Sequence, residues 1–371
     1  MTRYAVLTPP GTGAIAVIAV SGPDAWPLVL RRFRPAGKPL PVTPTLHAVR
    51  LGTLGDGAGD EVVVAVTQVA PVITVEIHCH GGPQVVRMLC ELLDAEGCHR
   101  AEWYALARGD EFDAAVLPFL AAAPTVRNAS ILLDQYHGAF RDAVRSPGVD
   151  LERLRQLVPV GAHLVTPWDV VVVGPPNAGK SSLVNAIAGY QRSVVTPIAG
   201  TTRDAVRVEV AIDGVAVRLT DTAGLRDTSD PLEAEGVRRA TGLMASADLV
   251  VYVIDGTDPA PIPDGVALVV WNKADLVAAP ADVLAVSATT GQGLRELMSR
   301  IVATLEPVQP LPGEAVPYGE YCAALGRPGD DIAASLARLF DTANPPTPGL
   351  SPTPRDTNSE TSPPFRGLGL N

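Results

Sequence analysis

One stretch of this sequence has the residue types and the spacing to bind phosphate. Gly174-Pro-Pro-Asn-Ala-Gly-Lys-Ser181 fits the eight-residue pattern of a phosphate-binding loop. Glycines let backbone N–H groups curl around an anion, and the N-terminus of the next helix adds a partial positive charge. We therefore expect Lys180 to reach the outer phosphates of a nucleotide and Ser181 to offer a hydroxyl to Mg²⁺. The alternative, a glycine-rich strand–turn–helix with a chance lysine, is disfavoured by the residues on either side.

Those flanking residues predict the elements that position the loop. The apolar run Val170–Val173 shows no polar alternation, which is typical of a strand buried on both faces of a parallel sheet. The run after the loop predicts a helix with Leu183, Val184 and Ile187 on one side, and this helix is expected to end at Gly189.

Two further motifs carry groups for the phosphates and their metal. Gly200-Thr-Thr-Arg-Asp204 offers Thr202 as a second hydroxyl ligand for Mg²⁺. Asp221-Thr-Ala-Gly224 ends a predicted strand, so Asp221 is expected beside the metal and the Gly224 N–H near a γ-phosphate. Alone each motif is weak, but their order after the phosphate loop indicates a nucleotide site.

Two more motifs predict which base is bound. Asp275, in Asn272-Lys-Ala-Asp, can accept hydrogen bonds from the ring N–H and the exocyclic amine of guanine. Adenine presents the wrong donors, and an unpaired buried carboxylate is costly. Ser287-Ala288 could offer backbone N–H groups to the guanine carbonyl. The expected nucleotide contacts are Asn177, Ala178, Gly179, Lys180, Ser181, Ser182, Thr201, Thr202, Asp221, Gly224, Asn272, Lys273, Asp275, Ser287 and Ala288.

The residues alone leave the group that activates water open. Small GTPases commonly place a glutamine directly after the DxxG motif, whereas this chain has Leu225 there, which cannot orient water. The loop that follows offers acidic candidates, and the alternative is a solvated acidic face at a helix start. These candidates are Asp227, Asp230, Glu233 and Glu235.

Composition bounds the class of protein. The chain of 371 residues, with 47% hydrophobic and 19% charged residues, is typical of a globular protein of two or three domains. No apolar run approaches the roughly 18–20 residues of a membrane helix. The four cysteines have no paired spacing, which favours a reducing cytoplasm. A net charge of −11 argues against a broad basic surface for nucleic acid but not against a small local one.

The pattern of elements predicts four regions. Residues 1–105 indicate an α+β domain, 106–165 a short helical segment, and 166–306 a GTPase domain with a mixed, mostly parallel sheet. Residues 307–371 are proline-rich and predict a mostly disordered tail, with one short helix at 330–342.

Within these regions we expect particular elements. The N-terminal strands are predicted at Ala14–Val20, Glu61–Val66 and Val72–Ile77, and a helix at Gln84–Leu93, whereas Leu51–Asp60 is interpreted as a turn cluster.

The GTPase region adds three expectations about how its elements are joined. Asp213-Gly214 predicts a tight hairpin. Pro159 and Gly161 mark a domain boundary. The connection from Leu249–Asp255 to Val266 is too short for a usual crossover helix, so one sheet face should be thinly covered.

At these motifs the chain resembles the tRNA modification GTPases, the TrmE (MnmE) family of the Era-like branch. The resemblance rests on GPPNAGKSSLVNAIAG, SVVTPIAGTTRD and LTDTAGLRDTSDPLEAEGVRRA in the GTPase region. TPPGTGAIAVIAVSGPDAW and EIHCHGGPQVV extend it to the N-terminal region. It implies an α/β P-loop GTPase domain, an N-terminal α+β domain and a helical segment that is reduced here.

The resemblance also implies a mechanism. In the family a glutamate of the acidic loop orients the catalytic water, and the matching residue is Glu233. A bound K⁺ replaces the arginine finger and is held partly by the asparagine matching Asn177. The loop Gln191–Gly200 closes over that ion when two GTPase domains meet, so a homodimer is expected. Glu233, Lys180 and Asn177 are thus the expected catalytic residues.

The family acts with an FAD-dependent partner on the wobble uridine of tRNA, and its N-terminal domain dimerises and binds a folate one-carbon donor. Two departures are visible here. The loop before HGGP is shortened to QVAPVIT, which argues against folate binding, and Cys322 in EYCAALG does not match the family's C-terminal cysteine motif.

Two alternatives for the function stay open. One is an Era-like ribosome-assembly GTPase, which would predict a basic RNA-binding module. The other is a nucleotide-binding regulatory switch or degenerate paralogue without modification activity, which the shortened helical segment and the missing cysteine motif favour.

Overall fold

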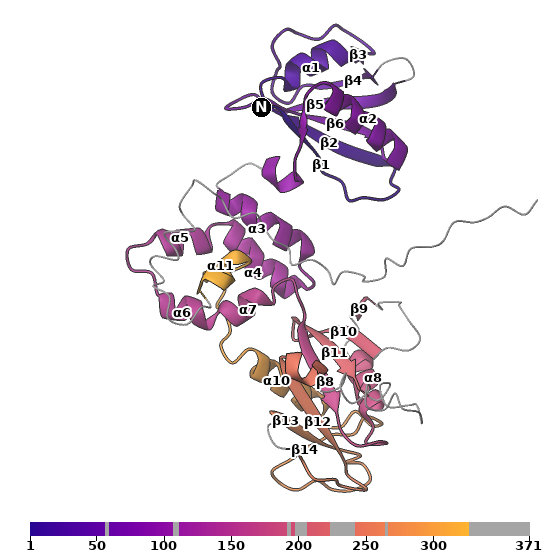
Figure 1. The fold of residues 1–371 in the computed structure, drawn as a ribbon, viewed down its shortest axis with the longest axis vertical. Helices are drawn as coiled ribbons and strands as arrows, with labels where there is room; N and C mark the ends of the chain where they lie inside the picture. Colours follow the sequence, from indigo (N-terminus) through magenta and orange to yellow (C-terminus); the bar gives the residue numbers. More distant parts are fainter. Residues whose placement is uncertain are drawn as a thin grey trace, which may run out of the picture. The chain divides into compact units, whose positions relative to one another are not determined.

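The computed structural model describes residues 1–55, 59–106, 111–190, 194–196, 206–222, 242–263 and 266–325 (Figure 1). The chain divides into two compact units, Met1–Leu117 and Pro118–Asn371. Each unit has its own sheet and its own hydrophobic core.

The first unit is an α+β domain built on a seven-stranded sheet of order β3-β4-β5-β6-β2-β1-β7. All its strand pairs are antiparallel except β1 with β7. The strands are β1 (Arg3–Val6), β2 (Ile15–Ser21), β3 (Phe33–Pro35), β4 (Val49–Leu54), β5 (Asp60–Gln68), β6 (Thr74–His80) and β7 (His99–Arg100). The helices are α1 (Ala25–Arg32) and α2 (Pro83–Ala95), followed by the 3₁₀ turn η1 (Trp103–Leu106).

Alternation along these strands explains why one face of the sheet is buried. Successive side chains of a strand point to opposite faces, and Ile18 in β2, Val64 in β5 and Ile77 in β6 all belong to one apolar cluster. Leu28 of α1 and Leu89 of α2 join the same cluster, so both helices cover this face. The strands predicted at 14–20, 61–66 and 72–77 and the helix at 84–93 are confirmed, each within a few residues.

The turn cluster predicted at 51–60 is wrong in its first half. Residues 49–54 form β4, which pairs with β3 on one side and β5 on the other. Gly52 is a close-approach residue, because a Cβ there would collide with the carbonyl oxygen of Arg34 and the ring of Phe33. A glycine that serves packing was therefore misinterpreted as a turn signal.

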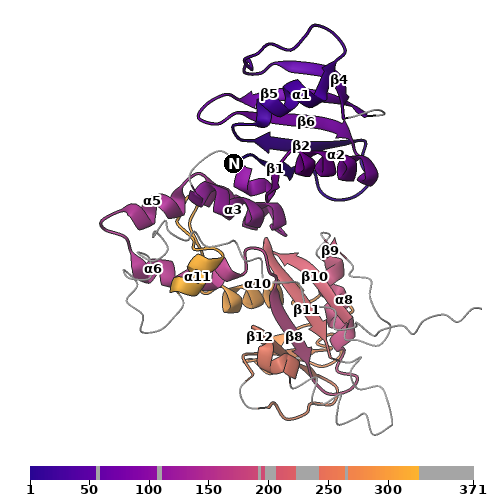
Figure 2. The same cartoon turned by 45° about the horizontal axis from the view of Figure 1, so that its top comes forward.

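The second unit contains a seven-stranded sheet of order β14-β13-β12-β8-β11-β10-β9 (Figure 2). The five strands from β14 to β11 run parallel, and β10 pairs antiparallel with β11 on one side and with β9 on the other. This is the mixed, mostly parallel sheet that the sequence predicts. The strands are β8 (Trp168–Val173), β9 (Val194–Thr196), β10 (Val206–Ile212), β11 (Val215–Asp221), β12 (Leu249–Asp255), β13 (Leu268–Asn272) and β14 (Leu284–Ala285).

Helices α8 (Lys180–Tyr190) and α10 (Leu294–Leu305) cover one face of this sheet. Leu183 of α8 and Leu297 of α10 share one buried cluster with Val170 and Val172 of β8. Val171 and Val173 point to the other face and belong to a second buried cluster, which confirms the predicted double-sided burial of that strand. Helix α8 continues to Tyr190, so Gly189 lies inside its last turn and does not end it, contrary to the prediction.

The opposite face is covered differently. No helix occurs among the described residues of the connection from β12 to β13, as the short spacing predicted, nor between β13 and β14. Two buried aromatic residues fill the space. The Tyr252 hydroxyl donates to the Pro261 carbonyl at 3.2 Å, and the Trp271 indole N–H donates to the Val277 carbonyl at 3.1 Å. Each connecting loop is thereby fixed over the sheet by one side-chain hydrogen bond.

The rest of the second unit is helical. The helices are α3 (Glu111–Ala122), which begins in the first unit, α4 (Val126–Tyr136), α5 (Ala139–Arg145), α6 (Leu151–Gln156), α7 (Val158–Ala162) and, after the GTPase sheet, α11 (Glu320–Leu325). Residues 159–161, where the sequence predicts a domain boundary, lie within α7. Position 161 of this helix needs glycine for packing, because a Cβ there would collide with the carbonyl oxygen of Pro317.

Residues 307–325 were interpreted as flexible tail, and the structure corrects this. Tyr318 is buried with its ring against Phe119 and Phe140, at centroid distances of 5.7 and 5.6 Å. The buried Gln135 amide donates to the Glu314 carbonyl and accepts from the Val316 N–H, both at 3.0 Å. Local proline content masked an aromatic cluster that completes the helical core. The predicted helix at 330–342 lies outside the described residues.

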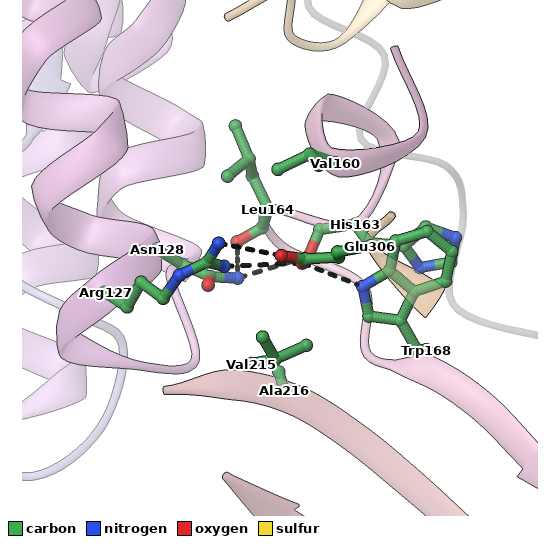
Figure 3. Close-up of a pocket in the computed structure, with 9 residues that line it drawn as sticks. All are labelled: Arg127, Asn128, Val160, His163, Leu164, Trp168, Val215, Ala216 and Glu306. Atoms are coloured by element: carbon green, nitrogen blue, oxygen red, sulfur yellow. Dashed lines mark hydrogen bonds and ion pairs between the residues drawn. The ribbon is translucent and has the colours of Figure 1, made fainter. Parts of the chain in front are cut away.

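A buried carboxylate joins the helical part to the GTPase sheet. Glu306, just after α10, is 4% exposed and lies between two donors (Figure 3). The Arg127 guanidinium of α4 contacts both its oxygens, at 2.7 and 3.3 Å, and the Trp168 indole N–H of β8 donates at 3.3 Å. Such a carboxylate stays buried only because it is paired.

Three further hydrogen bonds from the start of α4 accompany this ion pair. The Asn128 amide donates to the carbonyls of His163 and Leu164, at 3.2 and 2.9 Å. The Thr125 hydroxyl donates to the carbonyl of Gly214 at 2.7 Å, in the hairpin turn between β10 and β11. Asp213 and Gly214 both have positive φ, as the predicted tight hairpin requires.

We expect Arg127→Ala to destabilise the second unit by about 3 kcal/mol, because it leaves the buried Glu306 carboxylate without its cation. Urea denaturation followed by tryptophan fluorescence measures this. Arg300→Ala is the matched control, since Arg300 forms an exposed pair with Glu296 and should change stability by less than about 1 kcal/mol. Equal effects of the two substitutions would contradict a buried ion pair.

Candidate nucleotide site

Parallel strands bring the predicted motifs to one edge of the GTPase sheet. Strands β8, β11, β13 and β14 point the same way, so their carboxyl ends meet at that edge. The phosphate loop follows β8, Asp221 ends β11, Asn272 ends β13, and Ser287 follows β14. Ligands of open α/β sheets bind at the carboxyl ends of the strands.

The phosphate loop has the backbone that an anion cradle needs. Gly174 and Gly179 have φ of 151° and 88°, and Asn177 adopts the left-handed conformation at φ 61°. The buried Lys180 ammonium donates to the carbonyls of Gly174 and Pro175, at 3.2 and 2.8 Å, and so lies over the loop. Asn177 is exposed, and its side chain makes no hydrogen bond within the described part of the chain.

Two oxygen ligands for a hard cation lie together beside this loop. The Ser181 hydroxyl, at the start of α8, donates to the Asp221 carboxylate, which is 3% exposed. The neighbouring Thr222 hydroxyl is turned away and donates to the Val172 carbonyl at 3.0 Å. A hydroxyl and a carboxylate at one point fit Mg²⁺, which takes oxygen ligands.

Asn272 connects the base-binding loops to the phosphate loop. Its amide N–H donates to the Ala178 carbonyl at 2.8 Å, and its amide oxygen accepts from the Ala288 N–H at 3.2 Å. The side chain is 2% exposed. Gly179 must lack a Cβ here, because one would collide with this amide. Asn272 therefore acts within the protein.

The other base-site residues lie in contrasting environments. Asp275 is exposed, and its carboxylate has no partner within the described residues, so it is available to a ligand. Ser287 is fully buried, and its hydroxyl accepts from the Thr290 N–H at 3.1 Å. This bond shapes the turn that carries Ala288.

Sequence reasoning missed one residue at this edge. Asp255, the last residue of β12, is 6% exposed, and its carboxylate contacts the Lys273 ammonium at 2.6 Å. Burial alone would raise the pKa of Asp255, but hydrogen bonds from Lys273 and Thr257 outweigh it and lower the pKa. The signal in the sequence was its place at the end of a predicted buried strand, next to Gly256.

Several expected site residues cannot be placed. Thr201, Thr202, Gly224 and Glu233 lie outside the described residues, and Ser182 is exposed on the first turn of α8.

Cys322 is buried on α11, and burial raises the pKa of its thiol to about 12. A thiol with such a pKa stays protonated at neutral pH, so Cys322 does not offer the thiolate that cysteine chemistry needs.

The first unit contains a separate cavity of about 930 Å³. Its wall combines the loop at residues 8–13 with β1, β2 and α2, and carries the charged side chains of Arg87, Glu91, Asp94 and Arg100. The Tyr4 hydroxyl donates to Asp94 at 2.8 Å, and burial is the main cause that raises the pKa of this tyrosine. None of residues 68–74 lines the cavity.

Comparisons with known proteins cover both units. Residues 2–104 match the family described as GTP-binding protein TrmE N-terminus, and residues 169–278 match the family described as 50S ribosome-binding GTPase. No helix among the described residues is long and apolar enough to cross a membrane.

Individual relatives extend the match along most of the chain. A tRNA modification GTPase MnmE from Synechococcus sp. (strain RCC307) is 34% identical, covering 79% of this chain and 78% of that protein. One from Chlamydia felis is 31% identical over 83% and 82%. One from Hyphomonas neptunium is 49% identical over 39% of this chain and 34% of that protein. The chain is therefore a GTP hydrolase and belongs to the MnmE family of tRNA modification GTPases.

Proposed function

We propose that this protein hydrolyses GTP in the course of modifying the wobble uridine of tRNA. The observation that carries the proposal is the meeting of the phosphate loop, Asp221, Asn272 and Ser287 at one sheet edge, in a chain whose first unit matches the TrmE N-terminus. That match favours tRNA modification over ribosome assembly. A bare nucleotide switch would not need this domain.

In the proposed reaction each residue has one task. Lys180 leaves the Gly174 and Pro175 carbonyls to contact the outer phosphates, and Asp275 accepts the two guanine donors. Glu233 orients the attacking water through its hydrogen bonds. Backbone N–H groups of the phosphate loop hold the β-phosphate in line.

Two cations complete the proposed site. Ser181, Thr202 and Asp221 would hold Mg²⁺, directly or through water, and Asn177 would hold K⁺. When bound, both supply positive charge that offsets the charge on the phosphate oxygens. The Asn177 side chain is exposed and has no partner among the described residues, which supports its role as a ligand. By resemblance to the family, a second GTPase domain would complete this K⁺ site, so we propose a homodimer as the working state.

The pathway is tested by analysis of wobble uridines in tRNA from a strain that lacks this gene. We expect the full chain to restore the modified nucleoside, with an FAD-dependent partner, and Lys180→Ala to fail, because it removes the phosphate contact. Mass spectrometry of nuclease-digested tRNA measures the nucleoside. If the wild-type chain binds and hydrolyses GTP but restores nothing, the protein is a nucleotide switch or a paralogue without modification activity.

The N-terminal cavity favours a second ligand, a folate one-carbon donor. Its volume of about 930 Å³ suits a pteridine with its glutamate tail, and Arg87 and Arg100 could pair with carboxylates of that tail. The shortened loop at 68–74 lies away from its wall, so the shortening does not by itself remove the site. We expect calorimetric titration with folinic acid to show binding that Arg100→Ala weakens about tenfold. Arg50→Ala, outside the cavity, is the control, and equal affinities would exclude the cavity as the site.

A further inference from the structure

We infer that Asp255 is a positioning residue for guanine recognition, because it fixes Lys273 and with it the turn that carries Asp275. The inference rests on the proposed role of Asp275 as the guanine acceptor. No motif assigns a function to Asp255, which lies one strand away, at the end of β12.

The Asp255 carboxylate is fully used inside the protein. One oxygen contacts the Lys273 ammonium at 2.6 Å. The other accepts from the Thr257 N–H at 2.9 Å and from the Thr257 hydroxyl at 2.6 Å. With 6% of the residue exposed, this carboxylate is a fixed anchor.

Backbone pairing explains why the anchor is in reach of Lys273. Strands β12 and β13 are parallel, with Asp255 opposite Asn272, and the Gly256 N–H donates to the Asn272 carbonyl at 3.1 Å. Gly256 must be glycine, because a Cβ would come within 2.7 Å of that carbonyl oxygen. The two strand ends are therefore locked directly before the turn begins.

Lys273 needs such an anchor for two reasons, of which the first is the conformation of its backbone. Its backbone is left-handed, at φ 62°, a conformation that non-glycine residues rarely adopt and that the surroundings must hold. Its carbonyl accepts from the N–H groups of Leu276 and Val277, at 2.9 and 3.2 Å, so its conformation sets the path of the turn around Asp275.

The second reason is charge. Lys273 stands two residues from the Asp275 carboxylate, which must stay available to the guanine donors. While the Lys273 ammonium is paired with Asp255, it does not compete with the guanine donors for the Asp275 carboxylate. The base site is thus ordered and open before the nucleotide arrives, which lowers the ordering cost of binding.

The test compares GDP with IDP, whose base lacks the exocyclic amine that Asp275 accepts, by calorimetry on the full chain. We expect Asp255→Asn to weaken GDP binding about tenfold, as for the loss of a charge-assisted hydrogen bond. It should also reduce the GDP-over-IDP preference about fivefold, because a misplaced acceptor discriminates less. Lys273→Met should do the same, and the double variant should be no worse than either single one.

Two controls separate positioning from stability. Glu296→Gln alters an ion pair of similar length, 2.7 Å, on α10 and should leave the GDP-over-IDP ratio unchanged. Asp275→Asn should lose the preference for GDP over IDP altogether, so that its affinity ratio approaches one. If Asp275→Asn keeps it, the proposed base site is wrong. If Asp275→Asn loses it while Asp255→Asn keeps it, only the present inference fails. Should Asp255→Asn not fold, as judged by circular dichroism, an unchanged ratio in Lys273→Met overturns the inference.

Discussion

Replacing Asp275 by Asn is expected to remove tight GTP binding and to transfer the preference to XTP. The carboxylate accepts two guanine donors, whereas an amide accepts one and offers its own N–H to the other position. Xanthine carries a carbonyl in place of the exocyclic amine, so it suits the amide. We expect a loss on the order of 10³ in GTP affinity, below the 10⁴–10⁵ of enclosed sites, because Asp275 is exposed.

Competition between labelled GDP and XDP measures this change of preference. Asp282→Asn is the matched control, since Asp282 is another exposed aspartate of the same connecting loop. It should bind GDP like the wild-type protein. Unchanged GDP affinity in Asp275→Asn would show that Asp275 does not recognise the base, and the preference for guanine would then have no explanation.

Exchanging K⁺ for Na⁺ at constant ionic strength should lower the GTP turnover number at least about tenfold, because the proposed K⁺ would stand in for an arginine finger worth roughly 10³–10⁵. Glu233→Ala should lower turnover about 10²-fold in K⁺, the usual loss when a water-orienting group is removed. Phosphate release under saturating GTP measures both. The two changes act on the chemical step, so the affinity for GDP should stay the same.

Neighbouring acidic residues provide the comparison for Glu233. Glu235→Ala removes a carboxylate of the same loop and should keep most of the turnover. Equal rates in K⁺ and Na⁺ would exclude cation assistance, and full activity of Glu233→Ala would return the choice among the acidic candidates to an open question. Asn177→Ala should abolish the difference between K⁺ and Na⁺ without preventing GDP binding.

Local signals made the phosphate loop predictable. The four-valine strand, the Gly-Lys-Ser turn and the apolar side of α8 agree with one another, and each depends only on residues near it in the chain. The hairpin at Asp213-Gly214 is equally local, because the turn type demands left-handed residues there. The order of the strand ends then followed from the parallel sheet.

Features fixed by distant partners escaped prediction. The role of Gly52 depends on the ring of Phe33, and that of Gly161 on the carbonyl of Pro317, neither of which the local sequence shows. Asp255 stands at the end of a predicted strand, but its role is visible only through its contact with Lys273. Residues 307–325 fold because aromatic residues of α3 and α5 receive Tyr318, and local composition contains no trace of that.

The buried contact around Glu306 makes the helical part and the GTPase sheet a single cooperative folding unit. Trp168 and Glu306 lie at the two ends of the GTPase region, and Glu306 accepts from both Trp168 and Arg127 of α4. A fragment that begins at residue 166 would lose the cation that pairs with Glu306 and the partner of the Gly214 turn. The GTPase region therefore needs the preceding helices to reach full stability. Cutting the chain at the apparent sequence boundary would remove contacts that stabilise this region.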